Sequence, residues 1–291
     1  MHDRERCRRQ LSNACQEAVT SHWAEAYPKL ADAAEHWRYQ PATDSLTAKT
    51  ILVTGAGDGI GATTAKTLAC FGANVVLLGR TRQKLEAVFD WIEAHTETEP
   101  VIVPADLALI DEDSVGTLRD SIASTYGTLH GLINNASKLG PKVPLAHYPY
   151  GEWMDVMQTN VNAAFLLTKG LFDLLHESGD ACVLNISSTV GHAGRAYWGA
   201  YSASKFALEG LSQILADETE TAGHIRVYSI NPGGTRTNMR AEAYPLEDPN
   251  SLPHAEAHMD LFLYLLEGAR SGKDLPPTGS LIDCKTWDVN Q

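Results

Sequence analysis

The sequence has little of what marks secreted, membrane-embedded or nucleic-acid-binding proteins. Its 291 residues include five cysteines, an odd number with no CxxC pair, which is the usage of a reducing compartment. No apolar run approaches the ~20 residues that a membrane span needs. Acidic residues outnumber basic ones by 36 to 23, and the formal charge of -13 argues against general nucleic-acid or anionic-membrane binding. These absences favour a cytoplasmic globular protein with no nucleic-acid partner and no membrane partner.

Signals for export and for metal binding are also missing. The start of the chain is basic, but no apolar stretch follows it, and Asp3, Glu5 and Glu17 count against an organellar presequence. His254 and His258 lie four residues apart, a possible spacing for metal ligands on a helix. No further cluster of ligands accompanies them, so we expect no metal.

Residues 1–45 differ in composition from the rest of the chain. They are rich in Ala, Glu, Arg and His, with two tryptophans and two tyrosines among them. Rough helical spacing of the apolar residues predicts one or two helices, loosely attached or partly ordered. We expect a chain without residues 1–45 to keep the domain formed by residues 46–291. Loss of that domain's fold or binding would instead indicate that the segment packs as an integral part.

Patterns of strand and helix alternate along the remaining chain. Strands are predicted at 50–54, 74–78, 101–103, 131–133, 181–186, 225–230 and 280–283. Helices are predicted at 62–71, 84–95, 114–126, 152–176, 199–222 and 256–269, with an irregular, proline-containing stretch at 240–253. This alternation predicts an α/β fold, a Rossmann-type doubly wound parallel sheet in a single domain with an N-terminal helical extension.

The first two strands carry the pattern of a dinucleotide site. The first runs directly into Gly55-Ala-Gly-Asp-Gly-Ile-Gly61 and then into a helix, the context in which a glycine motif binds a dinucleotide. The glycines let the backbone approach a pyrophosphate at the positive end of the helix. The second strand ends at Gly79-Arg80, and an arginine there suits the 2′-phosphate of NADP, where an acidic residue would suit NAD. NADP is therefore the expected cofactor, with NAD possible.

Polar and small residues follow most of the other predicted strands as well. Asp106, Asn134, Ser188 and Pro232 each come directly after a strand. In a parallel sheet, the ends of the strands that these residues follow share one edge, and ligands bind there. The sequence thus predicts a single site at this edge.

Tyr201 and Lys205 are four residues apart in a predicted helix, so they share one face of it. A tyrosine hydroxyl titrates near ~10, and an ammonium group one turn away favours the phenolate. Ser188, at the end of the preceding strand, could hydrogen-bond a substrate oxygen. These three groups are what proton transfer to or from a carbonyl or carbinol oxygen requires.

Over roughly residues 48 to 284 the chain resembles the short-chain dehydrogenase/reductase family. The motifs that match it, in the family's order, are Thr54–Gly61, Asp106, Asn134–Ala136, Asn160, Ser188, Tyr201, Lys205 and Pro232–Thr235. The chain is especially similar to an uncharacterised bacterial branch that carries Asn-Pro-Gly-Gly-Thr-Arg-Thr, here Asn231–Thr237.

The resemblance implies an NAD(P)-dependent interconversion of a carbonyl and an alcohol, in a homodimer or homotetramer with a seven-stranded sheet. It implies that Tyr201 is the acid/base, that Lys205 lowers its pKa and holds the nicotinamide ribose, and that Ser188 polarises the carbonyl. Asn160 would anchor a proton-relay water. The implied cofactor-binding residues are Gly55, Gly57, Asp58, Gly59, Ile60, Gly61, Arg80, Asp106, Leu107, Asn134, Ala136, Tyr201, Lys205, Pro232, Gly233 and Thr235.

The chain departs from the family pattern at two positions. Ser137 stands where the family usually has glycine, and Asp58 stands where many NADP-dependent members have a basic residue. Two other functions stay open on the same fold: a regulator that senses the nucleotide without turnover, and an isomerase or dehydratase.

The substrate is expected to lie against three segments, 139–148, 192–198 and 236–244. Their arginines, Arg195, Arg236 and Arg240, suggest a carbonyl substrate with a carboxylate or phosphate group. The alternative is that these arginines are solvated or paired with Glu242 and Glu247.

Overall fold

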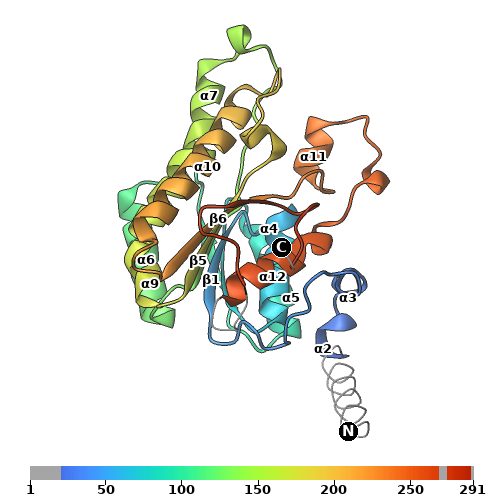
Figure 1. The fold of residues 1–291 in the computed structure, drawn as a ribbon, viewed down its shortest axis with the longest axis vertical. Helices are drawn as coiled ribbons and strands as arrows, with labels where there is room; N and C mark the ends of the chain where they lie inside the picture. Colours follow the sequence, from blue (N-terminus) through green and yellow to red (C-terminus); the bar gives the residue numbers. More distant parts are fainter. Residues whose placement is uncertain (1–20, 269–273, 290–291) are drawn as a thin grey trace, which may run out of the picture.

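The computed structural model describes residues 21–268 and 274–289, and its centre is a parallel sheet of seven strands (Figure 1). The strands are β1 (Thr50–Thr54), β2 (Asn74–Gly79), β3 (Val101–Pro104), β4 (Gly131–Asn134), β5 (Ala181–Ile186), β6 (Ile225–Asn231) and β7 (Leu281–Asp283). Each predicted strand end lies within one residue of the observed one. The prediction of a doubly wound α/β fold is confirmed.

The strand order is β3-β2-β1-β4-β5-β6-β7, with every neighbouring pair parallel. From β1 the chain first builds the sheet outward through β2 and β3, then returns to the other side of β1 to add β4. Ile51 of β1 accordingly pairs with Val75 on one side and Gly131 on the other. The connections diverge where the order reverses, which opens a crevice at the carboxyl ends of the strands.

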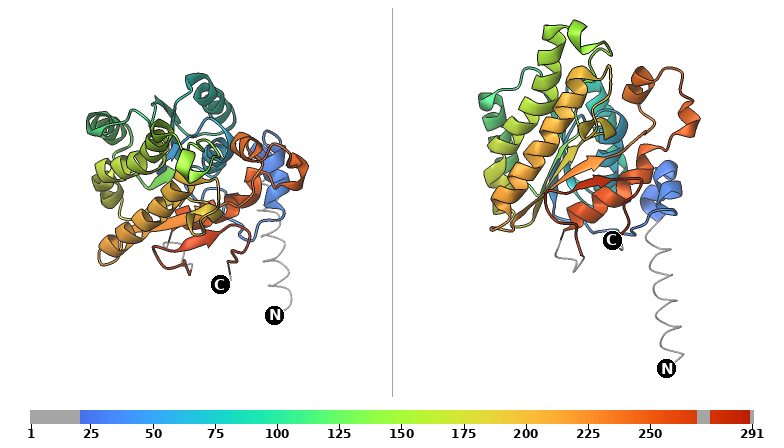
Figure 2. Two further views of the ribbon diagram at one scale, coloured as in Figure 1. Left: turned by 90° about the horizontal axis from the view of Figure 1, so that it is seen from above. Right: turned by 45° about the horizontal axis from the view of Figure 1, so that its top comes forward.

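Helices cover both faces of this sheet (Figures 1 and 2). They are α2 (Ser21–Ala24), α3 (Pro28–Ala34), α4 (Gly59–Cys70), α5 (Arg82–His95), α6 (Glu112–Tyr126), α7 (Tyr150–Met157), α8 (Ala163–Gly170), α9 (Phe172–Glu177), α10 (Gly199–Thr219), α11 (Asn238–Ala243) and α12 (Met259–Glu267). Side chains of α4, α5 and α12 pack with Ile51 and Val53 of β1, while those of α6, α8, α9 and α10 pack with Leu52 between them. Because successive side chains of a strand point to opposite faces, alternate residues of β1 belong to two separate hydrophobic cores. Within the described residues, no helix has both the length and the apolar character needed to cross a bilayer.

The prediction of one long helix over residues 152–176 was wrong. Helix α7 passes through a π-helical turn at Gln158–Asn162 into α8, and α8 ends at Gly170 before α9 begins. A side chain at position 170 would collide with Val115 of α6, so this glycine lets α8 and α6 approach closely. Apolar periodicity does not reveal a one-residue insertion such as a π turn.

The stretch predicted as irregular at 240–253 also contains a helix. Helix α11 begins after Thr237, whose hydroxyl accepts a hydrogen bond from the Arg240 N–H at 3.1 Å. This is an N-cap, and the first proline of the stretch, Pro245, comes only after the helix has ended. The helix predicted at 256–269 opens instead as a 3₁₀ turn, η5 (Ala255–His258), and continues as α12.

Residues 21–46 share the main hydrophobic core. Trp23, Leu30, Trp37 and Leu46 are 0–7% exposed and belong to the same cluster as the side chains of α4 and α12. The rings of Trp23 and Trp37 lie 5.7 and 6.2 Å from that of Phe71, at the end of α4. In Figures 1 and 2 this segment lies beside the C-terminal part of the chain. The described part of the segment is therefore packed rather than loosely attached. The part of the prediction that concerns residues 1–20 lies outside the described residues.

Three charged side chains close the amino edge of the sheet. Asp180, just before β5, lies 2.8 Å from Arg226 of β6 and 3.4 Å from Nζ of Lys49, just before β1. Lys49 also donates to the carbonyls of Leu266 and Glu267 at the C-terminal end of α12. Burial raises the pKa of Asp180, but the two cations outweigh it and hold that pKa below its usual value. The carboxylate balances one of the two positive charges, and the Lys49 ammonium satisfies free carbonyls at the negative end of a helix.

Candidate active site

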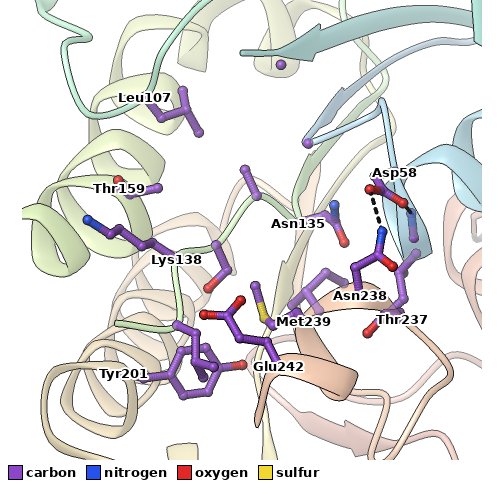
Figure 3. Close-up of a pocket in the computed structure, with 18 of the residues that line it drawn as sticks. Asp58, Leu107, Asn135, Lys138, Thr159, Tyr201, Thr237, Asn238, Met239 and Glu242 are labelled. Carbon is purple, nitrogen blue, oxygen red and sulfur yellow. Dashed lines mark hydrogen bonds between the residues drawn. The ribbon is translucent and has the colours of Figure 1, made fainter. Parts of the chain in front are cut away.

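A cavity of about 1150 Å³ lies at the carboxyl edge of the sheet. Its walls come from the turns that follow β1 to β6, from the start of α10 and from α11 (Figure 3). The predicted site residues that line it are Gly55, Gly57, Asp58, Gly59, Ile60, Arg80, Asp106, Leu107, Ala136, Ser188, Tyr201, Lys205, Pro232, Gly233 and Thr235. Three others, Gly61, Asn134 and Asn160, do not line it.

The turn after β1 needs glycine for two different reasons. Gly55 and Gly59 have φ of +66° and +51°, a conformation that other residues rarely adopt. Gly61 is buried, and a Cβ on it would collide with the Gly55 carbonyl. Gly61 therefore lets the helix pack against the turn and does not line the cavity. The glycines that do line it leave a rim of backbone that no side chain covers. A bare rim at the N-terminus of α4 fits a phosphate group.

Asp58 is held by neighbours that neutralise its charge. Its carboxylate caps α4 through the Gly59 N–H at 2.7 Å, and it forms an ion pair with Lys84 at 2.5 Å. Asn238 of α11 donates to it at 2.9 Å, as the dashed line in Figure 3 shows. Partial burial acts to raise the pKa of Asp58, but these contacts outweigh it and lower that pKa. The repulsion expected between Asp58 and a cofactor phosphate is therefore offset by Lys84.

Arg80 follows β2 on the same wall. Its side chain is exposed, lines the cavity and makes no ion pair with any described residue. Asp106 and Leu107 continue this wall after β3, and the Asp106 carboxylate accepts from the Ala108 N–H at 3.0 Å. The guanidinium thus carries a positive charge that no described carboxylate balances.

Ser188, Tyr201 and Lys205 meet at the other end. Tyr201 and Lys205 share one face of α10, with Nζ of Lys205 5.5 Å from the centre of the tyrosine ring. The side chain of Ser188 lies near that of Tyr201 and acts to lower its pKa. Lys205 is 2% exposed, and its ammonium donates to the Ile186 carbonyl at 2.7 Å. The predicted trio is brought together.

The titration of Tyr201 differs from the expectation. Burial raises the pKa of its hydroxyl to about 12, and the polar side chain of Ser188 opposes this only in part. Burial also lowers the pKa of Lys205 to about 8, against the attraction of Glu209. Desolvation of both side chains therefore outweighs the effect of Lys205 on the tyrosine, and Tyr201 carries its proton at neutral pH.

Asn160 lies in the π-helical turn, is buried and does not line the cavity. Its carbonyl oxygen accepts from the Lys138 N–H at 2.7 Å, and its amide donates to the Lys138 carbonyl at 3.0 Å and to Ser204 at 2.9 Å. The side chain thus ties the turn after β4 to α10, the helix that carries Tyr201. The predicted role as anchor of a relay water is untested.

Asn134 also lies behind the cavity wall. Its amide donates to Asn185 of β5 at 2.8 Å, and Asn185 in turn donates to Ser212 of α10 at 2.8 Å. The Asn134 Oδ1 atom is buried without a hydrogen-bond partner among the described residues. The backbone of the next two residues is fixed by Thr54, whose hydroxyl accepts from both of their N–H groups. Asn134 is thus part of a buried polar ladder that ties β4 through β5 to α10.

Two of the three proposed substrate arginines are bound by other residues of the chain. Arg240 is the one of the three that lines the cavity, and it makes two 2.6 Å hydrogen bonds to Glu247. Arg195 donates to the Tyr244 hydroxyl at 2.8 Å. The interpretation in which an arginine is paired with Glu247 therefore holds for Arg240. Arg236 does not line the cavity, and its Nε atom is buried with no hydrogen-bond partner among the described residues. Of the three arginines, the one that lines the cavity is thus already paired with a carboxylate.

Two lysines that line the cavity, Lys84 and Lys138, were not predicted as site residues. The predicted substrate segment 236–244 does reach the cavity, through Thr237, Asn238, Met239, Arg240, Glu242 and Ala243. The Glu242 carboxylate extends into the cavity beside Tyr201 (Figure 3), whereas Lys138 forms ion pairs with Glu152 and Asp155. The charged signal at Lys84 was visible in the sequence, five residues after β2, but only the fold shows that it reaches Asp58.

Comparison with known proteins agrees with this geometry. The family model for short chain dehydrogenase matches residues 49–248. The chain is 46% identical over 228 residues to the uncharacterized oxidoreductase YciK of Escherichia coli K12, which covers 78% of this chain and 90% of that protein.

Solved structures of similar proteins have the same fold. A short chain dehydrogenase of Shigella flexneri 2a solved with NADP is 44% identical, with a TM-score of 0.79 and coverage of 84% of this chain and 100% of that one. One of Escherichia coli CFT073 solved with NADPH gives the same identity, TM-score and coverage. By its sequence, its fold and the residues at its cavity, the chain is an enzyme of the short-chain dehydrogenase/reductase family.

Proposed function

We propose that the protein is an NADP-preferring oxidoreductase that interconverts a carbonyl and an alcohol, with Tyr201 as the acid/base. The observation that carries the proposal is the arrangement of one cavity, with an unpaired arginine at one end and a buried, protonated tyrosine at the other. The relatives solved with NADP and NADPH support the choice of cofactor.

The cavity fits a dinucleotide phosphate. The bare glycine rim at the N-terminus of α4 suits the pyrophosphate, and Arg80 suits the 2′-phosphate because β2 ends without a carboxylate. Lys84 neutralises Asp58 next to this position. When bound, the nicotinamide supplies or accepts the hydride.

The chain's own groups handle the proton. Because burial keeps Tyr201 protonated, its hydroxyl is ready to donate to a carbonyl oxygen that gains negative charge. Ser188 lines the same end of the cavity, where its hydroxyl would hydrogen-bond the same substrate oxygen. Lys205 stabilises the phenolate that remains, at 5.5 Å from the ring centre. The resting site is thus set as an acid, which favours carbonyl reduction.

A panel of carbonyl and alcohol substrates, assayed at 340 nm with NADP(H) and with NAD(H), tests the proposal. We expect turnover with a preference for NADP(H). Binding of NADPH without any turnover across the panel would favour the nucleotide-sensing regulator. Conversion of substrate without net change at 340 nm would favour an isomerase or dehydratase.

We also propose a cytoplasmic homo-oligomer. The three cysteines among the described residues are free and buried, which suits a reducing compartment. Met154 of α7, Phe165 of α8, and Phe206 and Ile214 of α10 are 45–55% exposed on neighbouring helices, which supports association between copies. Light scattering at several protein concentrations measures the oligomeric state. A monomer at every concentration would contradict the proposed homo-oligomer.

A further inference from the structure

The loop that closes the cavity after β6 is supported from outside the cavity. Asn231 accepts from the Gly233 N–H at 3.0 Å and donates to Asp283 of β7 at 2.8 Å. The Thr235 hydroxyl donates to the Pro232 carbonyl at 3.1 Å. Asp283 does not line the cavity, so its contact holds the loop without touching a ligand.

His258 provides a second support. Its Nε2 lies 3.0 Å from the Thr235 hydroxyl, and the two residues are 6% and 3% exposed. The hydroxyl hydrogen of Thr235 is already directed at Pro232, so the proton of this contact belongs to Nε2 of a neutral imidazole. His258, which also lies outside the cavity lining, therefore fixes the orientation of a residue that lines it.

The turn that carries His258 is held by the N-terminal segment. The Trp37 indole donates to the Glu256 carbonyl at 2.9 Å, and the Tyr27 hydroxyl donates to the Glu256 carboxylate at 2.9 Å. The Arg38 N–H donates to Asp260 at 2.9 Å. Three hydrogen bonds therefore link this segment to the residues on either side of His258.

Arg38 reaches the first support as well. Its guanidinium donates to the carbonyls of Cys284 and Lys285, at 2.8 and 2.9 Å, directly after Asp283. One residue of the N-terminal segment thus contacts both elements that support the loop. The family model begins at residue 49, so Trp37 and Arg38 lie outside the matched region.

We propose that Trp37, Arg38 and His258 form a rear brace that positions the loop Asn231–Thr235 and thereby sets the affinity for the dinucleotide. They are positioning residues, since none of them lines the cavity. The inference rests on dinucleotide binding by the proposed function and does not depend on the reaction that follows.

The first test is a titration of the full-length chain with NADPH, followed by fluorescence. His258→Leu removes the donor to Thr235 and should raise the Kd for NADPH by about three- to tenfold, the value of one hydrogen bond. His258→Gln keeps an amide donor near the position of Nε2 and should stay within about twofold of the wild type. Thr235→Val combined with His258→Leu should be no worse than the stronger single variant, because both remove one contact. An unchanged Kd in His258→Leu, or strictly additive effects, would overturn the brace.

The second test addresses the N-terminal segment. Arg38→Ala should raise the Kd for NADPH by a similar factor at a temperature where thermal unfolding shows the variant fully folded. Arg119→Ala is the matched control, since that arginine is exposed and pairs with Asp120. A rise in Kd that appears only once the variant begins to unfold would show a merely structural role and overturn the proposal. Intact NADPH binding without turnover would remove the proposed reaction and leave the brace standing.

Discussion

The two edges of the sheet treat polar groups in opposite ways. At the amino edge, Lys49, Asp180 and Arg226 pair with one another and with the end of α12. At the carboxyl edge, Arg80 is exposed, lines the cavity and has no ion pair with a described residue. The charges of the first cluster are thus bound by the protein itself, whereas the charge of Arg80 is left for a ligand. Substitutions at the two edges should therefore separate stability from function.

The largest effect is expected at the carboxyl edge. Tyr201→Phe should lower turnover by about 10²- to 10⁴-fold, because it removes the proton donor. Its loss of stability should be small, about 1 kcal/mol, because the only group removed is one hydroxyl near Ser188. Turnover, NADPH binding and thermal unfolding are measured on the same preparation. Retention of more than a tenth of wild-type turnover would remove Tyr201 from this role.

The amino edge should show the reverse. Asp180→Asn leaves Lys49 and Arg226 without their anion, and we expect a loss of about 3 kcal/mol in the free energy of unfolding. This is the lower end for breaking a buried pair, since the side chains keep 11–13% exposure. Asp120→Asn, in an exposed pair with Arg119, is the control and should change stability by less than about 0.5 kcal/mol. Urea unfolding gives both values, and equal losses would contradict the distinction between the edges.

A single arginine should decide the choice of cofactor. Arg80→Ala should weaken NADP binding by about ten- to hundredfold and leave NAD binding unchanged, because only the phosphate makes a charge-assisted contact there. Arg82→Ala is the matched control two residues later, where the guanidinium pairs with Glu86. The comparison is made by titration with both cofactors. Parallel losses for NADP and NAD would show that Arg80 supports the fold of the turn and does not select the phosphate.

The smallest effect concerns pH. Burial, aided by Arg38, lowers the pKa of His258 to about 4. The folded protein therefore holds this histidine neutral, while the unfolded chain binds a proton below its ordinary pKa of about 6.5. Its contribution to stability is present above that pH and is lost as the pH falls toward 4, by about 1 kcal/mol at pH 5.5.

Urea unfolding at pH 7 and pH 5.5 checks this, because His258→Gln should lose less stability on acidification than the wild type. Equal losses would show that other groups account for the pH dependence.

Features set by local pattern could be predicted from the sequence. The strand Thr50–Thr54 and the glycine turn after it depend on short-range periodicity and on backbone conformation, so their position was visible. The meeting of Ser188, Tyr201 and Lys205 followed from helical spacing and from the shared edge of a parallel sheet.

Features set by tertiary contact could not be predicted. The burial that raises the pKa of Tyr201 depends on what surrounds it, and the neutralisation of Asp58 depends on Lys84, 26 residues away. The same holds for Trp37, whose indole bonds to the carbonyl of Glu256, 219 residues away. Composition showed only that residues 1–45 are unlike the rest, and not what they pack against.

The amino-edge cluster also constrains the order in which the chain can fold. Nζ of Lys49 is satisfied by the Leu266 carbonyl, 217 residues later in the sequence. At the usual rate of synthesis, roughly 10 to 40 seconds separate the appearance of these two groups on the ribosome. During that time Lys49 and β1 have been synthesised, but the α12 carbonyl that Lys49 binds has not. Completion of the native state is thus a late, non-local step, which makes the nascent chain dependent on its own C-terminal end.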